Sequence, residues 1–188
     1  MRVLVGCEES ATVREEFVKR GHDAWSCDIL PSRKTGNHYQ RDIRDVLGYG
    51  WDMMIAHPPC TRLCNSGVRW LAERDLWKEM REAAEFFKML LNANIPLVCC
   101  ENPIPHKYAL GIIGKKYDQI IQPWQFGHGE TKATCLWLKG LPPLVPTNII
   151  EGREQRIWKM SPSPDRSRER SITFPGIASA MAEQWGTL

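Results

Sequence analysis

Short apolar runs alternate with amphipathic stretches through the first two-thirds of the chain, and this alternation constrains the fold more than any other feature. Buried strands are predicted at Arg2–Cys7, Asp23–Ile29, Trp51–Ala56 and Ile95–Cys100, with later candidates at Tyr117–Ile121 and Thr134–Leu138. Helices are predicted at Ala11–Arg20, with Ser10 as N-cap and Gly21 past its end, and at Trp70–Asn92. Strands that alternate with helices are typical of an α/β fold with a mostly parallel sheet and helices on both faces.

The composition of the sequence changes after residue 140. Three prolines within Leu141–Pro146 remove backbone donors, so this stretch cannot continue a sheet. The polar segment Glu151–Ser171 follows, with six basic against four acidic side chains, and Gly176–Trp185 is predicted as a terminal helix. We expect residues 1–188 to form one domain, with residues 141–171 as a Pro-rich and basic loop insertion.

Composition excludes several classes of protein. With 43% hydrophobic and 25% charged residues, the chain can bury a core, so disorder is not its main state. The net charge of +3 does not by itself indicate nucleic-acid binding. No apolar run approaches the ~18–20 residues that a membrane-spanning helix needs, and the N-terminus has no signal-peptide layout. We expect a cytoplasmic protein with no membrane partner.

Seven cysteines occur at positions 7, 27, 60, 64, 99, 100 and 135. Their number is odd and no secretion signal accompanies them, so a disulfide framework is not expected. Their spacing does not match a zinc site, and no metal is expected. Most of them are predicted to be small buried hydrophobes.

Acidic residues gather where the first predicted strands end. Gly6-Cys7-Glu8-Glu9-Ser10 joins the first strand to the first helix, the kind of turn at which open α/β sheets bind ligands. Its two carboxylates would repel a pyrophosphate, so it is not a phosphate loop. Asp28 lies where such folds place an acid that bonds a ribose, and Asp42 follows a third possible strand. Each acid alone is typical of a solvated loop; together they indicate a nucleoside with a cationic centre, such as S-adenosylmethionine.

Two further strand ends carry reactive side chains. His57-Pro58-Pro59-Cys60 follows a buried strand, and its prolines fix the direction of the cysteine. Glu101-Asn102 follows another buried strand, where a carboxylate is costly unless it is paired or used. A core thiol at Cys60 and a helix-cap cluster at Glu101 are the structural interpretations. The functional interpretation is a carboxyl group that faces Cys60 across the edge of the sheet.

The Pro58-Pro59-Cys60 and Glu101-Asn102 segments resemble, in order and separation, the Pro-Cys and Glu-Asn motifs of the cytosine-C5 DNA methyltransferases. The chain looks most like small, phage-borne members of that family. Asp28 and Asp42 match its cofactor-binding acids, and Ile172–Ala178 lies where its last helix returns to the cofactor. The resemblance implies a Rossmann-like class I methyltransferase sheet, S-adenosylmethionine as cofactor, DNA as partner, and the host cytoplasm as location if a phage encodes the chain.

The resemblance also implies roles for individual residues. Cys60 would add to carbon 6 of cytosine, and Glu101 would hydrogen-bond ring nitrogen N3 and the exocyclic amine. The target base would be flipped from a duplex or be single-stranded already. The residues implied to bind the cofactor are Cys7, Glu8, Glu9, Asp28, Ile29, Asp42, Ile43 and Pro58. Those implied to contact the substrate are Pro59, Asn65, Ser66, Asn102, Lys132 and Thr134.

Several positions depart from the family pattern. The family's glycine-rich first motif is replaced by residues 6–10, Thr61 replaces the glutamine after the cysteine, and Cys64 lies where serine is usual. Residues 141–171 stand in place of a large target-recognition domain, so a separate subunit could supply recognition. Three alternatives remain open: modification of a free cytosine nucleotide, methylation of an exocyclic nitrogen, and an idle module that binds DNA or a partner enzyme.

Basic and aromatic residues are candidates for contacts with the reactive groups or with DNA. Arg62 or Arg69 could lower the pKa of the Cys60 thiol. Residues 153–170 could contact phosphates, although a solvated loop is an equal interpretation. Four tryptophans are candidates for base stacking, while most of the eight are expected in the core: Trp70, Trp124, Trp137 and Trp158.

Overall fold

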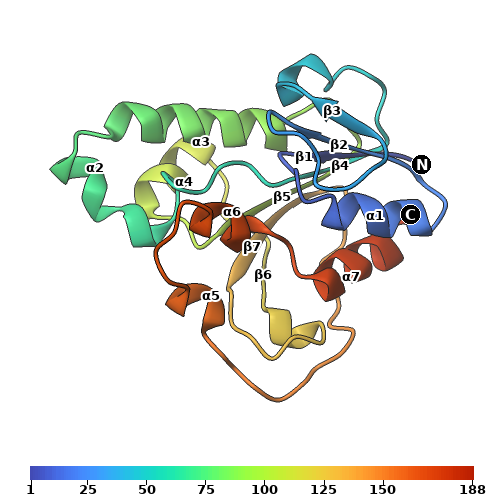
Figure 1. Cartoon of the computed structure of the whole chain (residues 1–188). Coiled ribbons are helices and arrows are strands. Elements are labelled where there is room, and N and C mark those ends of the chain that lie inside the picture. The colour runs from blue at the N-terminus through green and yellow to red at the C-terminus, as the bar shows by residue number, and fades with distance from the viewer.

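A seven-stranded sheet with the strand order β3-β2-β1-β4-β5-β7-β6 forms the centre of the computed structural model, which describes residues 1–188 (Figure 1). The strands are β1 (Arg2–Gly6), β2 (Asp23–Asp28), β3 (His38–Gln40), β4 (Met53–Ala56), β5 (Leu97–Pro103), β6 (Gln119–Ile121) and β7 (Thr134–Lys139). β7 runs antiparallel to β5 and β6, and the other paired strands are parallel. The prediction of a mostly parallel α/β sheet is therefore confirmed.

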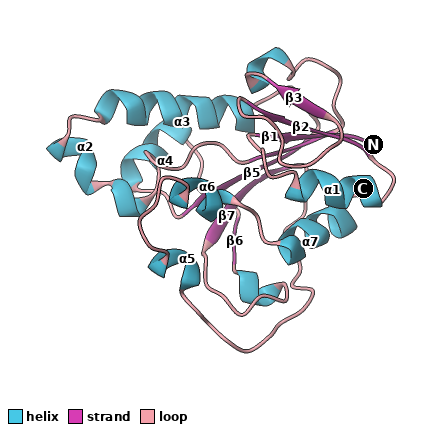
Figure 2. Cartoon of the chain, viewed as in Figure 1, coloured by secondary structure: helices cyan, strands magenta, loops and turns pink.

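Helices cover both faces of this sheet (Figure 2). They are α1 (Thr12–Lys19), α2 (Arg69–Glu73), α3 (Trp77–Leu91), α4 (Lys107–Ile113), α5 (Arg156–Lys159), α6 (Arg166–Ser171) and α7 (Pro175–Trp185). α1 and α7 pack against each other on one face, and α3 packs against α4 on the other. Successive side chains of each strand point to opposite faces of the sheet, as in any pleated strand. In β1, Val3 and Val5 join the cluster under α1 and α7, while Leu4 joins the cluster under α3.

The helix predicted at residues 70–92 is wrong as a single element, because it is divided into α2 and α3. Asp75 between them has a left-handed backbone with φ of 50°, a conformation that aspartate tolerates better than most residues. The Leu76 amide donates to the Leu71 carbonyl at 2.9 Å, the closing bond of a Schellman helix end. Leu71 and Leu76 are both apolar, so the helical spacing of apolar residues continues across the break and conceals it.

Residues 141–171 are mostly irregular, as their prolines predict, and contain only the short helices α5 and α6. Two isolated bridges hold this segment to the loop before β7: Phe126 pairs with Asn148, and Glu130 pairs with Glu154.

The terminal helix is confirmed as α7, which buries Ile177, Met181 and Trp185. All seven cysteines are free thiols. None of the helices combines the length and the apolar character that crossing a membrane requires.

Candidate active site

Three parallel strands end at the same level and bring the candidate segments together. Gly6 of β1 lies opposite Ala56 of β4, and Ala56 lies opposite Cys100 of β5. The strand order reverses between β1 and β4, and ligands of open α/β sheets bind at this reversal, outside the carboxyl ends of the strands. The segments that begin with Cys7, His57 and Glu101 therefore lie beside one another where such a fold takes its ligand.

The Pro-Pro-Cys turn is fastened directly to the Glu-Asn segment. The Asn102 side-chain amide is 1% exposed, and its Nδ2 donates to the Pro58 carbonyl at 3.3 Å. Beyond the turn, the Asn65 backbone amide donates to the Ile104 carbonyl at 3.0 Å, which joins the loop again to the end of β5. The charge of Glu101 acts on the half-buried Cys60 thiol. The two motifs thus form one rigid unit at the sheet edge.

The Cys60 thiol is paired with a second thiol one turn later in the chain. The Leu63 and Cys64 amides donate to the Cys60 carbonyl at 2.9 and 3.1 Å, and this tight turn places the two sulfur atoms side by side. A hydrogen bond from Cys60 to Cys64 raises the pKa of Cys60 and lowers the pKa of Cys64. Ser66 Oγ, 3.1 Å from Cys64 Sγ, and the Gly67 amide stabilise the Cys64 thiolate further. The pair therefore loses its first proton more easily than an isolated cysteine.

Glu101 has a histidine partner that the sequence analysis did not include in the site. His57 Nδ1 lies 2.7 Å from Glu101 Oε2, and each side chain is 9% exposed. Burial opposes the ionisation of both groups, but their mutual hydrogen bond and charge outweigh it. The pKa of His57 is raised as a result, and the pKa of Glu101 is lowered.

Lys132 and Thr134 reach the same place from the start of β7. Together with Glu101 they line a small cavity whose apolar wall includes Phe174 and Ile177. Lys132 Nζ donates to the Ile172 carbonyl at 3.3 Å, so the segment before α7 does return to the site. The charge of Lys132 acts on Cys60 as well as on Glu101. Lys132, instead of the predicted Arg62 or Arg69, is the cation whose charge opposes the rise in the pKa of Cys60, and its effect is smaller than those that raise it.

The end of β2 fits the nucleoside part of a cofactor. Asp28 is half-buried and accepts from the Leu30 amide through Oδ1 at 2.9 Å, and burial raises its pKa. Ile29 beside it is 73% exposed, which offers an apolar surface next to the acid. Cys7 adopts a left-handed backbone with φ of 55° where β1 turns toward α1. These three residues suit a ribose and an apolar ring better than a phosphate.

Glu8, in contrast, has a structural partner. Its carboxylate accepts from the backbone amides of Val13 and Arg14 at 2.7 and 3.3 Å, and so satisfies the first turn of α1. The predicted cap, Ser10, lies outside the N-cap position, which Ala11 occupies with a left-handed φ of 59°. Glu8 is 5% exposed, and this cap accounts for its burial.

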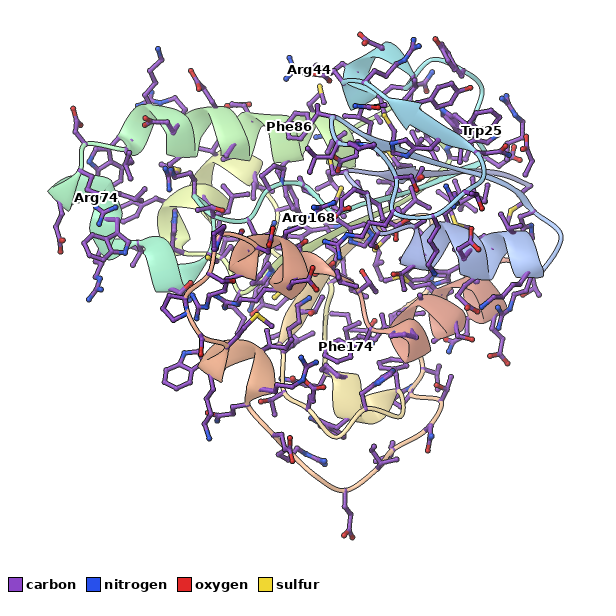
Figure 3. The ribbon with its side chains drawn as sticks, viewed as in Figure 1. Trp25, Arg44, Arg74, Phe86, Arg168 and Phe174 are labelled. Carbon is purple, nitrogen blue, oxygen red and sulfur yellow. The ribbon has the colours of Figure 1, made fainter.

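Glu9 belongs to an ion network that we call the Glu9 latch, formed by Glu9, Arg33, Arg168 and Glu169. Arg168 Nε and Nη2 donate to the two Glu9 oxygens at 2.8 Å, and Arg33 Nε bonds both oxygens at 2.9 and 2.8 Å. Arg33 Nη1 reaches Glu169 at 2.8 Å. The bond from Arg168, with help from Arg33 and against burial, lowers the pKa of Glu9 to about 2. Arg168 lies on α6 (Figure 3), so the latch ties residues 141–171 across the end of β1.

The remaining predicted residues take separate places. Asp42 accepts from the Arg44 amide at 2.9 Å and caps a short 3-10 helix at Ile43–Asp45. Ile43 is 3% exposed and packs on Gly6, where a Cβ would overlap Ile43 Cδ1. The other predicted residues divide by exposure: Pro58 is buried, whereas Pro59, Asn65 and Ser66 are exposed on the loop that carries Cys60.

One aromatic prediction was wrong, and two residues that bond the predicted site residues Glu101 and Glu9 had been missed, His57 and Arg168. Trp137 is fully buried against Phe87, with ring centroids 4.7 Å apart, so it cannot stack on a base. His57 had a sequence signal, because it is a polar residue at the end of a buried strand. Arg168 had none, because its partner Glu9 lies 159 positions away in the chain. No group of three or more histidine, cysteine, aspartate or glutamate side chains is arranged to hold a metal ion.

Comparison with models of known protein families finds no match, and comparison with curated proteins finds none. Among solved structures, the chain is similar to a protein assigned as a DNA modification methyltransferase encoded within an E. coli prophage. The TM-score is 0.53, with 13% identity over 86% of this chain and 55% of that one. Two other similar structures are the Entamoeba histolytica methyltransferase EhMeth (TM-score 0.48, 13% identity, 80% and 57% covered) and the S. pombe Dnmt2 methyltransferase (TM-score 0.46, 12% identity, 86% and 54% covered).

The chain spans little more than half the length of these structures. The likeness to the prophage protein establishes the fold, a mixed seven-stranded sheet with helices on both faces and one antiparallel strand near its edge.

Proposed function

We propose that this chain transfers a methyl group from S-adenosylmethionine to carbon 5 of cytosine in DNA, through a covalent adduct on Cys60. The observation that carries the proposal is the bond from Asn102 to the Pro58 carbonyl, which fastens the Pro-Pro-Cys turn to the strand end that bears Glu101. A nucleophile and a carboxyl group held at neighbouring strand ends beside a switch point suit attack on a planar ring that is activated at a ring nitrogen.

The roles of the chain's own residues follow from their contacts. The Cys64 thiolate accepts the proton of Cys60, so that the Cys60 sulfur can bond carbon 6. Glu101 hydrogen-bonds N3 and the exocyclic amine, and Lys132 offsets negative charge beside both groups. Asp28 and Ile29 would hold the nucleoside of the cofactor, which supplies the methyl group when bound.

Stacked cations and indoles on the surface support DNA rather than a free nucleotide as substrate. Arg69 and Arg74 lie over the ring of Trp70, 4.2 and 4.1 Å from its centroid. All three are on or beside α2, which follows the Cys60 loop and projects from the sheet, with Arg74 at its outer end (Figure 3). Such groups bind phosphates and stack on bases.

The segment 141–171 carries a second set of the same kind. Arg153 lies 3.9 Å from the Trp124 ring centroid, and Trp158 on α5 is 69% exposed. We expect a DNA strand to contact these groups in addition to Cys60 and Glu101. We take the segment as part of a single catalytic unit, with α6 near the cofactor and α5 free to contact DNA.

Trapping with 5-fluorocytosine DNA tests the proposal. Fluorine at carbon 5 prevents the final elimination, so a cysteine enzyme stays attached to the DNA on a denaturing gel. We expect a shifted band with wild type and S-adenosylmethionine, and none with Cys60→Ala. A band that persists in Cys60→Ala would refute the nucleophile. Labelling of a free cytosine nucleotide without any DNA adduct would refute DNA as the substrate.

A further inference from the structure

His57 is a buried polar residue that the roles given so far do not explain. β4 ends at Ala56, and the His57 amide continues its pattern by donating to the Gly6 carbonyl at 2.9 Å, which any residue could do. The imidazole itself donates through Nδ1 to Glu101, while Nε2 is buried and has no partner in the protein. A buried ring atom without a partner costs free energy, so folding alone does not account for a histidine here.

The groups around His57 favour a proton on the pair. Glu101 faces it from β5, Glu8 faces it from the loop after β1, and Lys132 faces it from the loop before β7. Burial lowers the pKa of His57, but the bond and charge of Glu101, with the charge of Glu8, raise it above its ordinary value, against a smaller effect of Lys132. The raised pKa of His57 and the lowered pKa of Glu101 favour an imidazolium beside a carboxylate, with the Nδ1 proton between them.

We propose that His57 is a positioning residue, which fixes the Glu101 carboxyl group toward the cytosine ring and keeps with it the proton that N3 requires. This inference rests on the proposed function. When the Cys60 sulfur bonds carbon 6, the π pair of C5–C6 shifts to C4–C5, and the π pair of C4–N3 moves onto N3. The Nδ1 proton of the His57 imidazolium passes through the Glu101 carboxyl group to N3. Glu101 is left as carboxylate and His57 as neutral imidazole with its remaining proton on Nε2.

Two variants of His57 separate this role from a purely structural one. Gln retains a donor for Glu101 but cannot ionise, whereas Ala retains neither. We expect adduct formation on 5-fluorocytosine DNA to be about 10-fold slower in His57→Gln and about 100-fold slower in His57→Ala, the scale of acid-base contributions. In His57→Gln the rate should fall at a pH at least about two units lower than in wild type, because an ordinary carboxyl group loses its proton about two pH units before an ordinary imidazolium does. The matched control is His22→Gln, at the opposite edge of the sheet, which should leave rate and pH profile unchanged.

Titration of the histidine ring by NMR in the free protein gives a readout that needs no activity. The pKa of His57 should lie above its ordinary value in wild type and fall in Glu101→Gln. The inference is overturned if the pKa of His57 does not change in Glu101→Gln, or if His57→Gln keeps the rate and pH profile of wild type. Should wild type form no adduct, the proposed function itself fails and this role fails with it, even if NMR shows the pair.

Discussion

We expect the Glu9 latch to stabilise the folded state measurably, and the substitution Glu9→Gln isolates its contribution. The Arg168 and Arg33 bonds lower the pKa of Glu9 from 4.5 to about 2. At neutral pH this difference sets an upper bound of ~3 kcal/mol on the stabilisation. Because the network is open to solvent on the Arg168 side, screening reduces the expected loss to about 1–2 kcal/mol. For a chain of this size that loss lowers the melting temperature by roughly 3–6 °C.

The pH dependence of this loss has a defined sign. A carboxylate with a depressed folded-state pKa stabilises the fold fully above its unfolded value, and the contribution disappears as the pH falls toward the folded value. The difference between wild type and Glu9→Gln should therefore be constant above pH 4.5 and narrow between 4.5 and about 2, which urea denaturation at several pH values measures.

Glu82→Gln is the matched control. It breaks a pair with Lys78 at 3.9 Å whose side chains are 86% and 66% exposed, and it should change stability by less than ~0.5 kcal/mol. Hydrogen exchange of the α6 amides should accelerate in Glu9→Gln alone. Equal stability of wild type and Glu9→Gln at pH 7, or a loss equal to that of Glu82→Gln, would refute the latch.

Three other substitutions test the site and the core. Cys60→Ala removes the hydrogen bond that stabilises the Cys64 thiolate, so the pKa of Cys64 should rise from about 5 toward 9.0; alkylation rates against pH measure this, and an unchanged profile would contradict the thiol pair. Trp137→Ala deletes a fully buried ring and should cost about 3–5 kcal/mol in urea denaturation, where a loss below ~1 kcal/mol would show that the site is not packed as described. Arg74→Ala should reduce the slope of DNA affinity against salt by about one contact without a change in melting temperature, and an unaltered slope would exclude α2 from the interface.

Features that depend on residues close together in the chain could mostly be predicted from the sequence, whereas contacts between distant residues could not. The period of the apolar residues gave the parallel sheet, because Val3, Leu4 and Val5 alternate between two buried faces whatever the rest of the chain does. The break between α2 and α3 at Asp75 was not predicted, because apolar residues can continue at helical spacing beyond a Schellman helix end. The partners of Glu8 and Glu9 were not predicted, for different reasons. Glu8 caps α1 locally, but through an unusual left-handed turn. Glu9 binds Arg168, which lies far along the chain.

The buried polar groups at the carboxyl edge of the sheet can be divided by whether folding explains them. Glu8 accepts from the amides at the start of α1, and Glu9 binds two guanidinium groups. These bonds within the protein offset the free-energy cost of burying both carboxylates. His57 Nε2 and Asn102 Oδ1 are buried without partners, and they belong to the two side chains that join the Pro-Pro-Cys turn to the Glu-Asn strand end. Partly satisfied polar networks are costly, and a protein retains them where position matters more than stability. Arg14 Nε and Glu130 Oε2 are buried without partners as well, but only His57 and Asn102 contact the segments that carry Glu101 and Cys60. The proposed function gives these two side chains a role in orienting Cys60 and Glu101, which their burial alone does not explain.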